Sequence, residues 1–329
     1  MVHQLKFQDT TVAVPGYGCM GLSHTYGAAN DDESKKTLKA AVDLGCTFWD
    51  SAVAYGNGGN EKLLGEFFKE TGTRDKVFVA SKCGFAVMPD DEEPTRAVTN
   101  TPAHINKYIE GTKERLGSYP DLYYLHRIDP NTPLEESIGA LDALRKAGKT
   151  KYIGLSECSV ATLRKASSIA KIDALQIEYS PWCTDHEDSG LIAAAKELGV
   201  QIVAFAPLGM GILSGKYRSA NDFEENDFRR FVPRFDEENF PKNLKIVDQF
   251  EKLAEAKGCT SGQIALAWVI AKGAIPIPGT RNAERLKENF GAGEVTLDDK
   301  ELAEIDDLVQ KAKPTGARFN EMVMSVMNK

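Results

Sequence analysis

The chain has 329 residues, of which 42% are hydrophobic and 27% are charged, and its formal net charge is −8. This is the composition of a globular protein, and the length allows either two domains or one large barrel. Nucleic acids and anionic membrane surfaces attract a surplus of Lys and Arg, so the acidic balance argues against both as main partners. Any anionic ligand must therefore meet a local cluster of basic residues.

The six cysteines form no CxxC pair, and no His stands at zinc-ligand spacing from them, which argues against a metal site. The segment MVHQLKFQDTTVAV lacks a basic stretch followed by an apolar one, so we expect no secretory signal and free thiols in the cytoplasm. The most membrane-like segment, residues 261–280, contains Lys272 and two prolines. It is expected to be a core helix followed by a strand, not a membrane span.

Compact apolar runs alternate with amphipathic helical stretches along the chain, after a predicted hairpin at residues 5–14. Eight apolar runs are expected to be strands, at residues 14–22, 47–52, 76–82, 121–128, 151–157, 174–180, 201–209 and 274–280. Helical patterns with capping residues at their ends occupy residues 32–45, 60–72, 105–117, 133–148, 160–171, 191–199, 243–258 and 261–273. Apolar strands that alternate with helices predict a parallel sheet covered by helices. Eight such units predict an α/β fold, a (β/α)8 TIM barrel forming one domain over residues 1–329.

A doubly wound dinucleotide-binding sheet is the competing architecture. Gly16, Gly18 and Gly21 form a GxGxxG pattern, and Asp50 ends the next predicted strand. In that motif the third glycine lies in a helix whose N-terminus faces the pyrophosphate. Here the next residues, LSHTYGAAND, have no helical periodicity, and a helix is expected only near Asp31. The barrel is therefore favoured.

Two predicted connections are longer than the rest, residues 84–104 after the third strand and residues 209–243 after the seventh. Long loops in a compact domain are usually lids or binding loops, and in a barrel the loops after the strands surround the active site. Substrate specificity is therefore expected to reside in these loops and in the C-terminal tail, residues 311–329.

Polar residues stand at the ends of several predicted strands. Asp50, Lys82 and His126 end the second, third and fourth strands, and Tyr55 follows the second. Singly, a lysine or histidine at such a position is more often a solvated or core residue. Together they would meet at the carboxyl ends of the barrel strands, here called the mouth of the barrel. There an ammonium group would stabilise a phenolate and lower its pKa, and a carboxylate would keep the buried lysine charged. This set predicts a proton donor for a carbonyl oxygen, which His126 could orient.

Segments around these positions resemble the aldo-keto reductase superfamily: residues 48–65, 77–82, 121–129, 153–157 and 277–289. Residues 205–217 are most similar to fungal and bacterial members related to pyridoxal reductases and potassium-channel β-subunits. The resemblance implies a barrel that binds NADPH/NADP+ without a Rossmann fold and reduces aldehydes or ketones. It also implies a catalytic tetrad of Asp50, Tyr55, Lys82 and His126.

The residues after the eighth predicted strand indicate the adenine end of the cofactor site. Thr280, Arg281 and Arg285 adjoin a predicted helix start, where phosphate groups bind and Arg pairs with them. Glu288 and Asn289 share a helical face with Arg285 and are expected at the adenine edge. The combination favours the 2′-phosphate of NADP(H), whereas the alternative is a solvated helix with spaced charges.

The cofactor preference has one departure from the family pattern. Gly279 stands where steroid and aldose reductases have a basic residue, and Arg281 is the candidate to compensate. The preference for NADPH over NADH is therefore a prediction.

The resemblance also implies where the other parts of the cofactor bind. Ser156 and Gln176 match positions that hold the nicotinamide carboxamide, and Tyr179 is either a stacking partner of the ring or a core residue. The loop over the pyrophosphate is expected to contain Ala206, Pro207, Leu208, Gly209, Gly211 and Lys216, with Phe228, Arg229 and Arg230 further along. Glu157 departs from the family, because many relatives have Asn beside the carboxamide serine. The apolar pocket wall is expected to include Met20, Trp49, Phe85 and Trp182.

These observations predict an NADPH-dependent carbonyl reductase in which hydride leaves C4 of the nicotinamide and Tyr55 is the general acid. Its partner would be a small-molecule aldehyde or ketone, and the protein would be a monomer or a weak homo-oligomer. One alternative is an NADP(H)-binding redox-sensor subunit with slow turnover. Another is a Schiff-base lyase using Lys82, which would need a depressed lysine pKa that the nearby Asp50 opposes.

Overall fold

The computed structural model describes residues 2–23, 30–88, 97–225 and 227–320, together with residues 324 and 327. Within these residues, a two-stranded antiparallel hairpin precedes an eight-stranded parallel sheet whose strands are neighbours in chain order. The strands are β1 (Gln4–Phe7), β2 (Thr10–Ala13), β3 (Tyr17–Gly18), β4 (Phe48–Asp50), β5 (Phe78–Cys83), β6 (Leu122–Leu125), β7 (Tyr152–Ser156), β8 (Ala174–Glu178), β9 (Gln201–Phe205) and β10 (Ile275–Pro276). The predicted (β/α)8 barrel with an N-terminal hairpin is confirmed.

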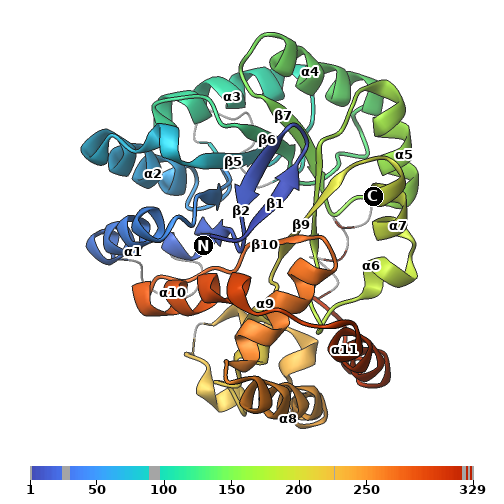
Figure 1. Ribbon diagram of the computed structural model, residues 1–329. Helices are drawn as coiled ribbons and strands as arrows, with labels where there is room; N and C mark the ends of the chain where they lie inside the picture. The colour runs from blue at the N-terminus through green and yellow to red at the C-terminus, as the bar shows by residue number, and fades with distance from the viewer. Residues whose placement is uncertain are drawn as a thin grey trace.

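Helices surround the strands, and the hairpin lies across one end of the barrel (Figure 1). The α-helices are α1 (Asp31–Leu44), α2 (Gly59–Thr71), α3 (Pro102–Leu116), α4 (Leu134–Lys146), α5 (Val160–Ile169), α6 (Asp185–Asp188), α7 (Leu191–Glu197), α8 (Phe240–Lys257), α9 (Ser261–Ala271), α10 (Ala283–Gly291) and α11 (Asp299–Lys311). The sequence patterns predicted most of these helices but missed α6 and α11. In the described part of the chain, no helix combines the length and apolarity needed to cross a membrane.

The barrel closes between its two shortest strands, β3 and β10. The amide of Gly16 donates to the carbonyl of Pro276 at 2.9 Å, and that of Gly18 donates to Pro278 at 3.2 Å. A Cβ on Gly18 would lie 2.7 Å from the carbonyl oxygen of Ile277, so this close approach requires glycine.

Both closing strands are shorter than the runs predicted at residues 14–22 and 274–280. Prolines in the second run have no N–H to donate to a ladder, and Cys19–Leu22 in the first run forms a 3₁₀ helix instead. The three glycines of the GxGxxG pattern thus belong to barrel closure and to this turn. Helix α1 begins only at Asp31, and residues 24–29 lie outside the described residues.

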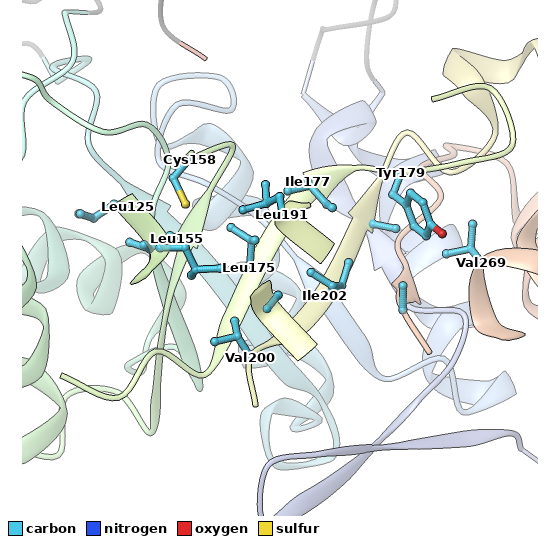
Figure 2. Close-up of a cluster of buried hydrophobic side chains, with 14 of the residues drawn as sticks. Leu125, Leu155, Cys158, Leu175, Ile177, Tyr179, Leu191, Val200, Ile202 and Val269 are labelled. Atoms are coloured by element: carbon cyan, nitrogen blue, oxygen red, sulfur yellow. The ribbon is translucent and has the colours of Figure 1, made fainter. Parts of the chain in front are cut away.

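Side chains on the strands alternate between the inside of the barrel and the helices outside it. On β5, Ala80 belongs to the inner cluster, whereas Val79 and Cys83 pack against the helices. Figure 2 shows part of the outer layer, where Leu155, Leu175 and other side chains of β6–β9 gather. The same alternation places every second residue of a strand where it can reach the barrel interior.

Of the two predicted long loops, residues 89–96 of the first and residue 226 of the second lie outside the described residues. The described part of the second loop forms short 3₁₀ turns, among them Gly209–Ser214, Phe228–Phe231 and Pro233–Phe235, before α8 begins.

Candidate active site

Asp50, Lys82 and Tyr55 meet at the carboxyl end of the barrel. Asp50 is the last residue of β4, and Lys82 lies on the adjacent β5. The Nζ of Lys82 donates to an Asp50 carboxylate oxygen, to the carbonyl of Ser51 at 2.8 Å and to the Tyr55 hydroxyl at 3.3 Å. Lys82 is fully buried, so its charge is stabilised by these three oxygens.

Burial and ion pairing together set the protonation of this cluster. Burial opposes the charged form of Lys82, but the oxygens of Asp50 and Tyr55 outweigh it and raise the pKa of Lys82 above its ordinary value. Burial also raises the pKa of Tyr55, and the Lys82 ammonium opposes this shift without reversing it. The expectation that Lys82 would bring the pKa of Tyr55 below its ordinary value is therefore wrong for this environment. The Tyr55 phenol is therefore protonated at neutral pH.

Two buried residues at the start of α2 hold the segment that carries Tyr55. The side-chain oxygen of Asn60 accepts a hydrogen bond from Ser51 Oγ at 2.6 Å. Glu61 accepts from the Oγ of Ser81, the neighbour of Lys82 on β5, at 2.5 Å. Both residues are fully buried. No sequence signal distinguished them from ordinary helix-start residues.

His126 follows β6 and faces the tyrosine. Its ring lies edge-on to Tyr55, with centroids 5.8 Å apart, and to Phe85, with centroids 5.1 Å apart. Burial, together with the Arg127 and Lys82 cations, holds the pKa of His126 well below its ordinary value. The imidazole is therefore neutral at neutral pH, and its buried Nδ1 has no hydrogen-bond partner among the described residues.

Ser156 and Gln176, the predicted carboxamide-binding residues, lie side by side on β7 and β8. Both are buried, and the Gln176 amide donates to Asp50 Oδ2 at 2.7 Å. Arg127, which the sequence analysis missed, donates through one guanidinium nitrogen to the carbonyl of His126 at 2.6 Å and to Ser156 Oγ at 3.3 Å. It thus connects the backbone of His126 to Ser156. Its place directly after His126 was the only signal that could have found it.

The loop after β9, residues 206–211, curves tightly and is here called the cradle. Ala206, Gly209, Met210 and Gly211 all have positive φ, between 46° and 96°. The amides of Gly209 and Gly211 donate within the loop, to the carbonyls of Ala206 and Leu208 at 2.9 and 3.0 Å. Pro207 and Gly209 are buried, and Ala206, Leu208, Met210 and Gly211 are half-buried.

Basic residues further along the loop have structural partners. Arg229 is buried against Asp227, donates to the carbonyl of Met210 at 2.9 Å and lies 4.4 Å from the centroid of the Tyr217 ring. Arg230 donates to two backbone carbonyls of the same loop, and Phe228 is half-buried against the core. Arg229 therefore fixes the shape of the cradle, whereas Lys216 is exposed and its Nζ lies 5.3 Å from the centroid of the Tyr217 ring.

The predicted adenine end lies at the start of α10. Asn282 caps this helix by accepting from the amide of Arg285 at 3.0 Å. The carbonyl of Thr280 accepts from the buried Tyr17 hydroxyl at 2.6 Å, and the carbonyl of Arg281 accepts from Thr37. These contacts hold the backbone between β10 and α10, next to Gly279, which pairs with Gly18 across the barrel closure.

Exposure on α10 follows the predicted face. Arg285 and Glu288 are exposed and Asn289 is half-buried. Glu288 already accepts a hydrogen bond from Thr260 Oγ1 at 2.8 Å. The helix therefore presents Arg285 and Asn289 together, with Glu288 held beside them.

Trp49, a candidate for the pocket wall, and Tyr179, a candidate to stack on the nicotinamide ring, both pack outside the barrel. Trp49 stacks on Phe68 of α2, with centroids 5.5 Å apart, because residue 49 faces outward when Asp50 faces inward. Its assignment to the pocket wall is therefore wrong. Tyr179 packs against Trp268 and donates to Glu187, which makes it a core residue, the second of the two predicted readings (Figure 2).

The other wall candidates remain near the mouth. Phe85 contacts the His126 ring, and Met20 is half-buried on the turn after β3. Trp182 is buried beside Gly209 of the cradle and stacks on Phe235, with centroids 6.1 Å apart. These three side chains come from separate loops above the strands.

Glu157, the departure from the family pattern, has a defined environment. It has a positive φ of 50°, and its carboxylate accepts from the amide of Glu178 at 2.7 Å. Burial works against its charge, but His186 and Arg318 overcome this and lower the pKa of Glu157 to about 2. Arg318 comes from the C-terminal tail, and no sequence signal indicated that it would reach this position.

The described residues contain no group of three or more His, Cys, Asp or Glu side chains that could hold a metal ion.

The model of the Aldo/keto reductase family matches residues 16–310. An aldo-keto reductase of Gibberella moniliformis is 52% identical over 334 residues, covering 100% of both chains. In Schizosaccharomyces pombe, the aldo-keto reductase yakc, named with NADP(+), is 44% identical over 319 residues, which is 95% of this chain and 93% of the relative.

Solved structures show the same similarity. A glycerol dehydrogenase from Gluconobacter oxydans superposes with a TM-score of 0.86 at 27% identity, covering 96% of this chain and 97% of that one.

Proposed function

Because the chain belongs to the aldo/keto reductase family, we propose that it is an NADP(H)-dependent oxidoreductase that reduces an aldehyde or ketone to an alcohol. The observation that carries the proposal is the buried contact of Lys82 with both Asp50 and Tyr55. NADPH, when bound, supplies the hydride from C4 of its nicotinamide. The protein supplies the proton and the geometry.

Tyr55 donates its proton to the carbonyl oxygen as the carbon is reduced. A phenol is a weak acid, and the phenolate left behind is stabilised by the Lys82 ammonium 3.3 Å away. Asp50 keeps that ammonium charged, and Gln176 holds the second carboxylate oxygen of Asp50. His126 is neutral and orients the substrate oxygen toward the Tyr55 hydroxyl by donating a hydrogen bond.

The residues present fit NADP(H), because groups suited to each part of the cofactor lie around the carboxyl ends of the strands. Ser156 and Gln176 offer a hydroxyl and an amide at one end, suited to the nicotinamide carboxamide. The positive-φ cradle around Gly209 lies in the middle, and the exposed Arg285 at the start of α10 suits a 2′-phosphate at the other end. The name of the Schizosaccharomyces relative supports the same cofactor.

The site argues against the Schiff-base alternative. A lysine that forms a Schiff base must be neutral, whereas Asp50 and Tyr55 raise the pKa of Lys82. The substrate is a small carbonyl compound, and its identity depends on residues of the loops above the strands and of the C-terminal tail.

Steady-state assays of aliphatic, aromatic and pyridoxal-type aldehydes with NADPH and with NADH test the proposal. We expect NADPH absorbance to fall with at least one carbonyl class and a lower KM for NADPH than for NADH. Tight NADPH binding without turnover of any carbonyl would contradict a reductase. Co-purification with a partner protein would then favour the redox-sensor alternative.

A further inference from the structure

Arg318 connects the C-terminal segment to the carboxyl ends of β7 and β8. It follows α11 in the chain, yet its side chain is only 4% exposed. The backbone before it is held in place, because Asn243 bonds to both the amide and the carbonyl of Thr315 at 2.8 and 2.9 Å. Arg234 adds a hydrogen bond to the carbonyl of Gly316 at 3.3 Å. The segment is therefore anchored up to the point where Arg318 enters the barrel mouth.

The guanidinium of Arg318 binds two buried carboxylates. Its Nε donates to Glu178 Oε2 at 2.9 Å, and one terminal nitrogen lies 3.2 Å from both carboxylate oxygens of Glu157. Both glutamates are fully or almost fully buried, and the ring of His186 lies 3.4 Å from Glu157. Without Arg318 the two carboxylates would face each other in a low-dielectric site and repel.

Glu157 has a strained backbone and directly follows Ser156, a residue expected to bind the cofactor. Its φ of 50° is unfavourable for a residue with a side chain, so the surrounding contacts must hold it there. It directly follows Ser156, whose hydroxyl accepts from Arg127 at 3.3 Å. A change in the turn at Glu157 therefore moves Ser156, one of the two residues suited to the carboxamide.

We propose that Arg318 is a positioning residue for the nicotinamide end of the cofactor site, acting through Glu157 on Ser156. This rests on the proposed function. Glu157 then has a role of its own: it receives the C-terminal segment and does not bind the carboxamide. The adenine end, at α10 on the far side of the cradle, is independent of this contact.

The test compares two ligands that share the adenine end. NADPH reaches both ends of the site, whereas 2′,5′-ADP carries the adenosine and 2′-phosphate and no nicotinamide. Arg318→Ala and Glu157→Gln are expected to raise the Kd of NADPH by about tenfold, the loss of roughly one good hydrogen bond, and to leave the Kd of 2′,5′-ADP unchanged. Arg318→Lys keeps the charge and should recover part of the NADPH affinity.

Lys313→Ala is the matched control, because Lys313 lies on the same segment and pairs with the exposed Asp188 at 2.5 Å. We expect it to change neither Kd. An equal loss of both ligands in Arg318→Ala, or no loss of NADPH affinity, would overturn the inference, since a tether of the tail alone predicts no difference between the ligands. If Arg318→Ala does not fold, Glu157→Gln decides by the same comparison. Failure of the unmutated protein to bind 2′,5′-ADP would overturn the proposed function, and this inference with it.

Discussion

The two ends of the barrel differ in the side chains that they bury: apolar ones at the amino end and charged ones as well at the carboxyl end. At the amino end the β1–β2 hairpin covers the strands, and Phe7 packs edge-on against Phe78 and Tyr152, with centroids 5.3 and 5.1 Å apart. At the carboxyl end, charged side chains are buried beside the aromatic rings, among them Lys82 and Arg318. An apolar plug gains free energy from burial, whereas buried charges cost free energy unless each is paired.

Residues that stabilise the fold and residues expected to take part in the reaction therefore lie at opposite ends of the same strands. Side chains that enter the barrel from the same strand serve different purposes at its two ends: on β5, Ala80 belongs to the apolar inner cluster and Lys82 to the charged mouth. Changes at the closed end should therefore affect unfolding, changes at the cofactor rim should affect binding, and changes among the paired charges should affect both stability and turnover.

Lys82→Met should have the largest effect, because it removes the ammonium group that stabilises the Tyr55 phenolate and leaves the Asp50 carboxylate buried without a cation. We expect the free energy of unfolding to fall by about 3–5 kcal/mol and kcat to fall on the order of 10²–10⁴-fold. Chemical denaturation and steady-state kinetics measure the two quantities. As a control, Arg164→Met, which removes the surface pair with Glu197, should change neither. Normal turnover in Lys82→Met would show that the paired charges at the carboxyl end are not needed for the reaction.

Phe7→Ala tests the closed end. Phe7 is fully buried, so losing its ring should lower the free energy of unfolding by about 3–5 kcal/mol. Below the unfolding transition, kcat per folded molecule should not change, because the ring neighbours of Phe7 are Phe48, Phe78 and Tyr152, the first residues of β4, β5 and β7, which lie at the amino ends of these strands. A large loss of kcat in folded protein would show that the two ends are coupled.

Arg285→Ala should weaken NADPH binding by about 10–100-fold, the range for a hydrogen bond to a charged group. NADH lacks the 2′-phosphate, so its Kd should stay the same. Lys287→Ala is the matched control, because Lys287 is exposed on the same helix but faces another direction. Equal weakening of both cofactors in Arg285→Ala would mean that Arg285 does not contact the 2′-phosphate.

The smallest expected effect is on the pH dependence of reduction. His126 has a pKa well below its ordinary value, and Tyr55 has one above its ordinary value. Neither group therefore changes protonation near neutrality, and kcat/KM should vary less than roughly twofold between about pH 6 and 8. The rate should fall only at alkaline pH, as Tyr55 loses the proton it must donate. An inflection near the ordinary pKa of histidine would show that His126 titrates during catalysis.

Local patterns predicted most of the architecture and the meeting of Asp50, Lys82 and Tyr55. Strand and helix periods indicated the alternating units, and the ends of parallel strands share one edge of a barrel, so polar strand ends had to converge. Strand length was harder to predict at β10, where prolines in an apolar run prevent a ladder. Trp49 was misplaced because the alternation of side chains along β4 was not applied to it.

The contacts of Arg318 could not be predicted for a different reason. Arg318 lies 161 residues from Glu157 and 140 from Glu178, and no periodic pattern connects them. Its burial depends on how the segment after α11 folds back over the strands. Likewise, the net pKa direction of Tyr55 depends on how deeply the loop buries it, which spacing alone does not determine.

The central claim is that Tyr55 is the proton donor at the open end. Its most direct test is the turnover of Tyr55→Phe with saturating NADPH, together with the Kd of NADPH for the same variant. We expect kcat to fall on the order of 10²–10⁴-fold, with the Kd within roughly twofold of the unmutated value, because only the hydroxyl is removed. Near-normal kcat in this variant would contradict the assignment of Tyr55.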